Sequence, residues 1–197
     1  MRVEDLIERA KKLKERGLTT GEIAAELNVS KETAMWLLAK ARKDIVPPSD
    51  VYVDLKGIAN PIRMRCIAVI LANMIEENIK EKPEVVVGVA TSGIPLATMV
   101  AEELNAELSM YYPKKLKWES DQLRIGGIFS ENFAKVNGKK CVIVDNVITS
   151  GSTIKETAEQ IKNREGEVIG AAVIIDKKGL DKIDDFPVLS IFKIVRL

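Results

Sequence analysis

The feature that most constrains the fold is a regular alternation of short apolar runs and longer helical segments after residue 60. Three runs, "EVVVGVA" (84–90), "KKCVIVD" (139–145) and "EVIGAAVIID" (167–176), have the continuous apolar character of strands buried inside a sheet. Helical segments such as "IPLATMVAEELN" (94–105) and "STIKETAEQIKNREG" (152–166) separate them. This order predicts a mainly parallel α/β sheet with helices on both faces and right-handed crossovers.

The first 45 residues predict a separate, small all-α domain. A first helix covers "VEDLIERAKKLKERG" (3–17), a capping box of Thr19 with Glu22 opens a second, and Ser30 caps a third that runs to about residue 43. The apolar positions between them have the spacing of a helix-turn-helix core: Ile23, Ala24, Leu27, Val29, Ala34 and Leu37. Two prolines in "VPPSD" (46–50) indicate a linker, after which a second domain covers residues 51–197.

A helix-turn-helix inserts the N-terminal end of its second helix into the major groove of DNA. The predicted DNA-contacting residues are Ser30, Lys31, Glu32, Met35, Trp36, Arg42 and Lys43. Residues 1–43 hold ten Lys or Arg and seven Asp or Glu, a local charge of 10 − 7 = +3, so one copy should bind DNA weakly. We therefore expect a homodimer on promoter DNA, with half-sites about 34 Å apart. The alternative is a three-helix docking or dimerisation domain, with Trp36 packed against its neighbour.

Composition removes several kinds of chemistry. The chain has no histidine, which excludes Ser-His-Asp and Cys-His catalysis and any His-ligated metal site. Its two cysteines, Cys66 and Cys141, lie in apolar runs and predict buried thiols of a reducing cytosol. No apolar run approaches the roughly 18 residues that span a bilayer, and the N-terminus does not read as a signal peptide, so we expect a cytoplasmic protein without a membrane partner.

Two strand-to-helix loops carry the candidate ligand site: "ATSGIP" (90–95) and "DNVITSGST" (145–153). Ligands of parallel sheets bind at the carboxyl ends of the strands. In the second loop, successive backbone N–H groups and hydroxyls precede a helix N-terminus, an arrangement that binds phosphate. Asp145, which precedes them, can accept hydrogen bonds from two ribose hydroxyls. The loops therefore predict a ligand built on ribose 5-phosphate; the alternative is a capped turn without a ligand.

These residues carry a family resemblance. "VIVDNVITSGST" (142–153) resembles the phosphoribosyl pyrophosphate (PRPP) motif of type I phosphoribosyltransferases, and "GVATSGIPLA" (88–97) is similar to the pyrophosphate loop of orotate phosphoribosyltransferases. "YVDLKG" (52–57) is a looser match to their N-terminal hood. The resemblance implies a type I phosphoribosyltransferase fold and a cis peptide bond between Ala90 and Thr91. The implied ligand-binding set is Thr91, Ser92, Gly93, Asp145, Asn146, Thr149, Ser150, Gly151, Ser152 and Thr153.

Three departures from the family pattern affect catalysis. Asn146 stands where the motif usually has a second acid, and Ser92 where orotate enzymes usually have a lysine. The segment "YPKKLKWESDQLRIGGIFSEN" (112–132) has lysines but lacks the histidine of the catalytic loop. If the chain is active, the candidate catalytic residues are Lys114, Lys115, Lys117 and Asp145. We expect no tightly bound cofactor and no metal on the protein alone, with Mg²⁺ binding only together with PRPP.

The two domains in this order leave two functional hypotheses. The whole chain resembles archaeal phosphoribosyltransferase-like transcriptional regulators described for glucose and fructose catabolism. By that resemblance it is a DNA-binding regulator that senses PRPP or a related phosphorylated molecule. The alternative is an active orotate or purine phosphoribosyltransferase with an accessory helix-turn-helix.

Overall fold

The computed structural model describes residues 2–39, 48–114 and 127–195. They form two compact units, each with its own apolar core, and the division falls between Asp54 and Leu55. The linker predicted at 46–50 ends four residues before this division. Residues 48–54 belong to the first unit.

The first unit contains three helices, α1 (Val3–Glu15), α2 (Thr20–Glu26) and α3 (Lys31–Ala39). The predicted capping box is present, because the Thr19 side chain accepts from the Glu22 N–H and the Glu22 carboxylate accepts from the Thr19 N–H. Asn28 has a φ of 51°, in the left-handed region that lets the chain turn between α2 and α3. The predicted end of the third helix near residue 43 lies outside the described residues.

The core of this unit contains the six predicted residues and, in addition, Ala10 of α1. The buried residues are Ala10, Ile23, Ala24, Leu27, Val29, Ala34 and Leu37. Tyr52 also packs against this core, and its hydroxyl accepts a hydrogen bond of 3.0 Å from Arg9 Nη1. The start of "YVDLKG", the looser match to the N-terminal hood of the family, therefore belongs to the helical unit.

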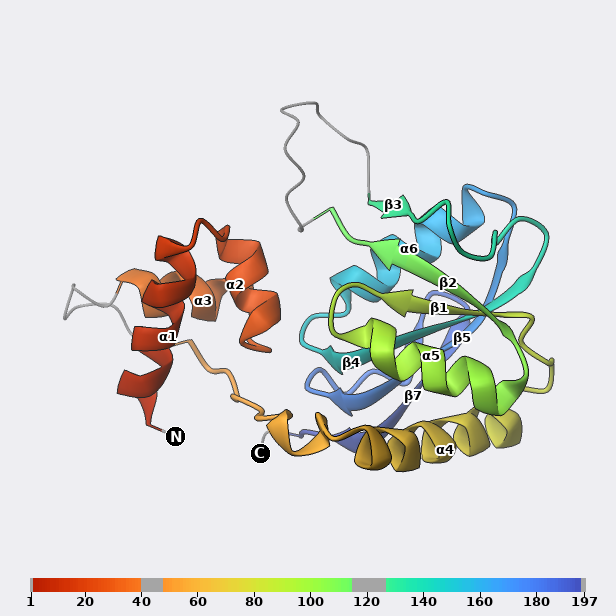
Figure 1. Cartoon of the computed structure of the whole chain (residues 1–197), viewed down its shortest axis with the longest axis horizontal. Helices are drawn as coiled ribbons and strands as arrows, with labels where there is room; N and C mark the ends of the chain where they lie inside the picture. Colours follow the sequence, from red (N-terminus) through yellow and green to blue (C-terminus); the bar gives the residue numbers. More distant parts are fainter. Residues whose placement is uncertain (1, 40–47, 115–126, 196–197) are drawn as a thin grey trace. The chain divides into compact units, whose positions relative to one another are not determined.

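The second unit contains one seven-stranded sheet in the order β3-β2-β1-β4-β5-β7-β6 (Figure 1). Its strands are β1 (Val85–Val89), β2 (Glu107–Tyr112), β3 (Ile128–Phe129), β4 (Lys140–Ile148), β5 (Glu167–Asp176), β6 (Lys182–Ile183) and β7 (Phe186–Lys193). The five central strands are parallel, and β3 and β6 pair antiparallel at the two edges. The predicted mainly parallel sheet is confirmed.

Helices cover both faces of the sheet, also as predicted (Figure 1). On one face lies α6 (Ser152–Lys162), whose residues Ile154, Ala158 and Ile161 share a core with alternate residues of the central strands. On the other lie α4 (Pro61–Asn78) and α5 (Gly93–Leu104), after the short 3₁₀ turn η1 (Lys56–Ile58). Gly88 in β1 permits close packing of α5, because a Cβ there would lie 2.8 Å from the Cβ of Ala97.

Two details of the sheet differ from expectation. Strand β4 continues to Ile148, three residues beyond the predicted end, because Val147 and Ile148 still pair with β5. The two-residue strands β3 and β6 were not predicted. Strands this short form only because a longer neighbour supplies their partners, so no local pattern indicates them.

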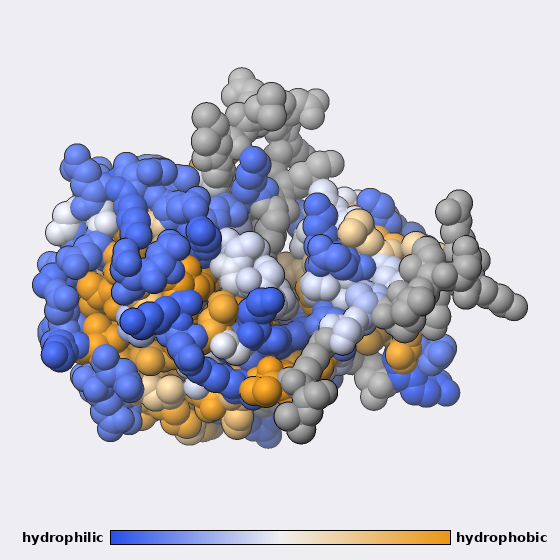
Figure 2. Space-filling view, turned by 180° about the vertical axis from the view of Figure 1, so that it is seen from behind, coloured by the Kyte–Doolittle hydropathy of each residue, from blue (hydrophilic) through white to orange (hydrophobic). Residues whose placement is uncertain are grey.

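Helix α4 exposes an apolar surface that includes Ile62, Val69 and Ile70, with exposed fractions of 75%, 46% and 44%. Apolar residues also gather at the lower edge of this unit in Figure 2, the level at which α4 lies in Figure 1.

Cys66 is exposed on α4, so its predicted burial is wrong. The residues that α4 buries lie on a different stripe of the helix: Ala68, Leu71, Ala72 and Ile75. Among the helices that the structure describes, none is both long and apolar enough to cross a membrane.

The two thiols are expected to react very differently. Cys141 is fully buried in β4, and burial, with the nearby Glu84 carboxylate, raises the pKa of its thiol to about 12. Since the thiolate is the reactive species, native protein treated with iodoacetamide should carry a single adduct, on Cys66. Denatured protein should carry two, and mass spectrometry of the intact chain distinguishes them. Rapid alkylation of Cys141 in native protein would contradict the buried position of β4.

Candidate functional site

The two candidate loops meet at the carboxyl edge of the sheet. Strands β1 and β4 are parallel neighbours, with Gly88 opposite Val144, so the loops that follow them leave the sheet on the same side. Gly93 lies directly against β4, because a Cβ built on it would be 3.0 Å from Asp145 Oδ1 and 3.0 Å from the carbonyl oxygen of Val144. The absence of a side chain at residue 93 therefore allows the two loops to meet.

The first loop has the conformation that the resemblance implied. The peptide bond between Ala90 and Thr91 is cis, and the Ala90 N–H donates to the carbonyl oxygen of Tyr111 over 2.8 Å. Thr91 and Ser92 are exposed, whereas Gly93 is buried and begins α5. The loop thus presents two hydroxyl side chains at the sheet edge.

The second loop delivers hydroxyls to the start of α6. Gly151 occupies the cap position of this helix with a φ of 83°, a left-handed conformation that favours glycine. Ser150 and Ser152 are exposed, and their hydroxyl oxygens lie 2.9 Å apart. Thr149 and Thr153 are half-buried. Hydroxyls and the first N–H groups of a helix are the groups that hold phosphate in proteins.

The acid of the motif is half-buried beside the first loop. Asp145 Oδ1 accepts a hydrogen bond of 2.7 Å from the backbone N–H of Asn146, which is half-buried too. The predicted ligand-binding residues are therefore gathered on two adjoining loops at one edge of the sheet. What they bind stays a prediction.

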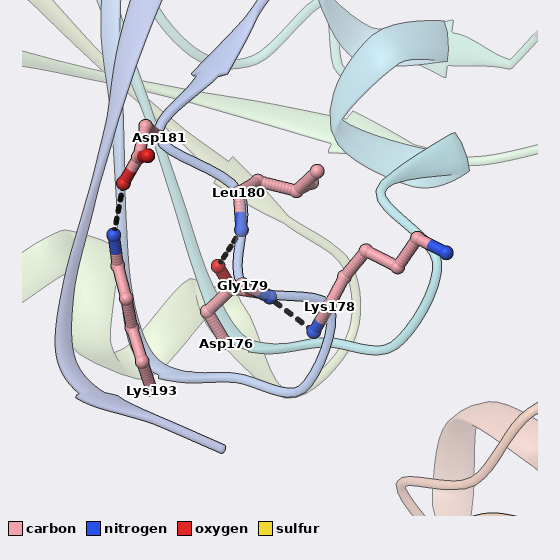
Figure 3. Close-up of polar contacts among 6 residues, drawn as sticks. All are labelled: Asp176, Lys178, Gly179, Leu180, Asp181 and Lys193. Atoms are coloured by element: carbon pink, nitrogen blue, oxygen red, sulfur yellow. Dashed lines mark hydrogen bonds and ion pairs between the residues drawn. The ribbon is translucent and has the colours of Figure 1, made fainter. Parts of the chain in front are cut away.

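The turn that follows β5, residues 176–180, is drawn in Figure 3 and packs against the second loop. The buried carboxylate of Asp176 accepts N–H groups from Lys178 over 2.8 Å, from Gly179 over 3.0 Å, and from Leu180. Leu180 then lies over Gly151, since a Cβ on that glycine would be 2.9 Å from Leu180 Cδ1. The acid and glycine of "DKKG" indicate a turn, but no local pattern places Leu180 on a loop some thirty residues earlier.

Glu156 is a second residue that the sequence interpretation missed. Its Oε1 accepts hydrogen bonds from the Tyr111 hydroxyl (2.8 Å), the Lys114 N–H (2.8 Å) and the Gly127 N–H (3.1 Å). Burial and the hydrogen bond to this carboxylate raise the pKa of the Tyr111 phenol well above its usual range. Lys114 is exposed, and Lys115 and Lys117 lie outside the described residues. Glu156 thus connects α6 to Lys114 and Gly127, the described residues that precede and follow positions 115–126.

The predicted DNA-contacting residues on α3 are only partly exposed. Lys31, Glu32 and Met35 are exposed. Ser30, at the N-terminus of the helix, is half-buried. Trp36, which was expected to face outward, is half-buried and packs against the helical core. Arg42 and Lys43 lie outside the described residues.

Comparison with known proteins gives consistent relationships along the chain. The model of the phosphoribosyl transferase domain family matches residues 58–196. A transcriptional regulator GfcR from Archaeoglobus fulgidus is 52% identical over 196 residues, covering 100% of this chain and 99% of that protein. One from Haloferax volcanii is 41% identical over 205 residues, covering 99% of this chain and 97% of that protein.

Solved structures agree on the fold of the sheet unit. An orotate phosphoribosyltransferase from Aeropyrum pernix superposes with a TM-score of 0.59 at 22% identity, covering 79% of this chain and 83% of that one. An adenine phosphoribosyltransferase from Thermoanaerobacter pseudethanolicus also gives 0.59, at 18% identity, covering 75% of this chain and 90% of that one. At these identities the similarity establishes the fold alone.

Proposed function

We propose that this chain, which belongs to the phosphoribosyl transferase domain family, is a DNA-binding transcriptional regulator. Its sheet unit would bind PRPP or a related phosphorylated effector. The regulator class is supported by relatives of that name that match the chain from end to end, helical unit included. Genes of central sugar catabolism are the targets that the family resemblance favours.

The ligand half of the proposal depends on one observation: the backbone of Gly93 lies against Asp145. This contact brings the loop of Thr91 and Ser92 beside the acid and the hydroxyls that precede α6. A ligand with a 5-phosphate at the start of α6 would place its ribose hydroxyls near Asp145 and its pyrophosphate near the first loop. We expect Mg²⁺ to enter with the pyrophosphate of PRPP rather than to bind the protein alone.

The DNA half of the proposal depends on the helical unit. Helix α2, the left-handed turn at Asn28 and α3 follow one another as in a helix-turn-helix, and Lys31 is exposed at the N-terminal end of α3. That end is the one that enters the major groove in this motif. We propose a homodimer on promoter DNA, and the exposed apolar surface of α4 supports self-association.

Replacing Asp145 by alanine is expected to weaken PRPP binding at least tenfold, because charge-assisted hydrogen bonds to the ribose would be lost. Isothermal titration calorimetry with PRPP, with and without Mg²⁺, measures the affinity. Asp185→Ala removes the same charge from an exposed position in the turn between β6 and β7, and should bind PRPP like the wild type. Equal affinities for Asp145→Ala and the wild type would argue against the proposed site.

The transferase alternative has a direct assay. Transfer requires stabilisation of a departing pyrophosphate. The chain has Ser92 where orotate enzymes usually have a lysine, Asn146 where the motif usually has a second acid, and no histidine. Incubation of the protein with PRPP and orotate, adenine or guanine should therefore release no pyrophosphate at enzymatic rates. Release of pyrophosphate at about 1 to 10 turnovers per second would establish an enzyme instead.

A further inference from the structure

Helix α3 lacks half of the cap that α2 possesses. In α2, the cap residue Thr19 and the acid Glu22 three residues later satisfy each other's backbone N–H groups. In α3, the Ser30 hydroxyl accepts from the Thr33 N–H over 3.1 Å, but Thr33 stands where Glu22 stands in α2. A threonine there has no carboxylate to return to the N–H of the cap residue, which must find an acceptor elsewhere.

Asp50 supplies that acceptor from twenty residues along the chain. Its Oδ2 accepts the Ser30 N–H over 2.7 Å and the Thr33 hydroxyl over 2.9 Å. Its Oδ1 accepts the N–H of Val51 over 2.7 Å, which fixes the carboxylate relative to its own backbone. Asp50 therefore completes the capping box of α3 from outside the helix.

The segment around Asp50, residues 48–54, is also attached to α1. Tyr52 packs against the core of the helical unit and receives the hydrogen bond from Arg9. We call residues 48–54 the strap. Leu55, the next residue, begins the sheet unit, so the strap is the covalent connection from that unit to the cap of α3.

We propose that Asp50 is a positioning residue for DNA binding, acting through Ser30 and Thr33 to hold the first turn of α3 in place. The inference depends on the proposed function, in which this end of α3 meets DNA. Lys31 lies in that first turn. Without an acceptor for the Ser30 N–H the turn would fray, and Lys31 would lose a fixed position relative to the DNA backbone.

Charge and position predict opposite effects for a substitution at this site. Removing a carboxylate from a DNA-facing surface lowers repulsion of phosphates, so charge alone predicts tighter binding by Asp50→Ala and Asp50→Asn. Positioning predicts weaker binding by Asp50→Ala. It also predicts recovery in Asp50→Asn, because the one amide oxygen can still accept from the Ser30 N–H and the Thr33 hydroxyl, and only the bond from the Val51 N–H is lost. The sign of the change therefore distinguishes the two mechanisms.

Thr19→Ala provides a matched control for stability. It removes the cap of α2. Losing a helix cap lowers stability by about 0.5–2 kcal/mol, so Thr19→Ala and Asp50→Ala should destabilise the helical unit by similar amounts. The first turn of α3 keeps its bonds to Asp50 in this variant.

The DNA probe is a pool of duplexes of about 30 base pairs, which is long enough for two half-sites. The pool is enriched by selection on the wild-type protein. Fluorescence anisotropy at several salt concentrations measures the affinity, and amide hydrogen exchange of residues 30–34 measures the order of the first turn.

We expect Asp50→Ala to bind this DNA about tenfold more weakly and to exchange faster at residues 30–34. Asp50→Asn and Thr19→Ala should each stay within about threefold of the wild type. Tighter binding by Asp50→Ala, or an equal loss in Thr19→Ala, would refute the positioning role. If wild-type protein shows no salt-dependent DNA binding, the proposed function itself fails, and the exchange data then report only on the cap.

Discussion

Replacing Gly93 by valine is expected to reduce the affinity for PRPP at least a hundredfold. A Cβ at this residue would already lie 3.0 Å from Asp145 Oδ1 and 3.1 Å from Asp145 Cα, and valine adds two methyl groups beyond it. The backbone of β4 cannot retreat, because it is paired on both sides in the sheet. The first loop must therefore move away from Asp145, and a ligand that needs both loops loses its contacts with one of them.

A graded series makes this result specific. Gly93→Ala adds only the Cβ and should cost about tenfold, or about 1.4 kcal/mol. Gly57→Ala is the control, because a Cβ on Gly57 would have no heavy atom within 4 Å. Calorimetric titration with PRPP measures all three variants, and circular dichroism checks that each is folded. If Gly93→Val binds PRPP like the wild type, the two loops do not act on one ligand.

The second large effect is expected at Glu156, where alanine should lower the free energy of unfolding of the sheet unit by about 2 to 3 kcal/mol. One carboxylate oxygen accepts hydrogen bonds from three donors, and one of them is the hydroxyl of the fully buried Tyr111. Removing the acceptor leaves the buried Tyr111 hydroxyl proton without the bond that offsets its desolvation, whereas the Gly127 N–H keeps the Tyr111 hydroxyl oxygen as an acceptor over 3.0 Å.

Urea unfolding followed by circular dichroism measures this loss. Glu159→Ala is the matched control: this residue is exposed on the same helix and should change stability by less than about 0.5 kcal/mol. The variant Glu156→Gln, which keeps an acceptor oxygen, should fall between the two. A Glu156→Ala protein as stable as Glu159→Ala would show that water replaces the carboxylate without cost.

The same network implies a dependence on alkaline pH. Burial and the bond to Glu156 raise the pKa of Tyr111 above that of an unfolded tyrosine, so the folded state holds the phenolic proton more tightly. The corresponding stability is fully present below about pH 10 and is lost as pH rises towards the folded pKa. In Glu156→Ala, the part of this alkaline dependence that comes from the hydrogen bond should disappear. The part that comes from burial of the phenol should remain.

Local patterns in the sequence were sufficient for most of the fold. The alternation of apolar strands with helical segments identified the parallel sheet. Burial of a strand on both faces and the periodicity of a helix are both visible as patterns over a few consecutive residues. The caps at Thr19 and Ser30 identified the starts of α2 and α3 for the same reason: a cap bonds a residue only three positions away. The position of Asp145 before a Thr/Ser/Gly turn likewise located the candidate ligand site.

Sequence reasoning failed where the partner of a residue is distant in the chain. The burial of Cys66 was predicted wrongly because an apolar run on a helix does not show which stripe faces the sheet. Trp36 was expected to face outward but packs against the helical core. The edge strands β3 and β6 and the extension of β4 to Ile148 depend on pairing with other strands.

By itself, then, the sequence determined the order of the elements, the core of the helical unit and the residue types available at the sheet edge. Only the tertiary structure decided that Gly93 lies against Asp145, that Leu180 covers Gly151, that Glu156 joins α6 to Tyr111, and that Asp50 caps α3. The physical reason is the range of the interactions. Periodicity and capping act over one or two turns of chain, whereas these contacts join residues between 20 and 52 positions apart.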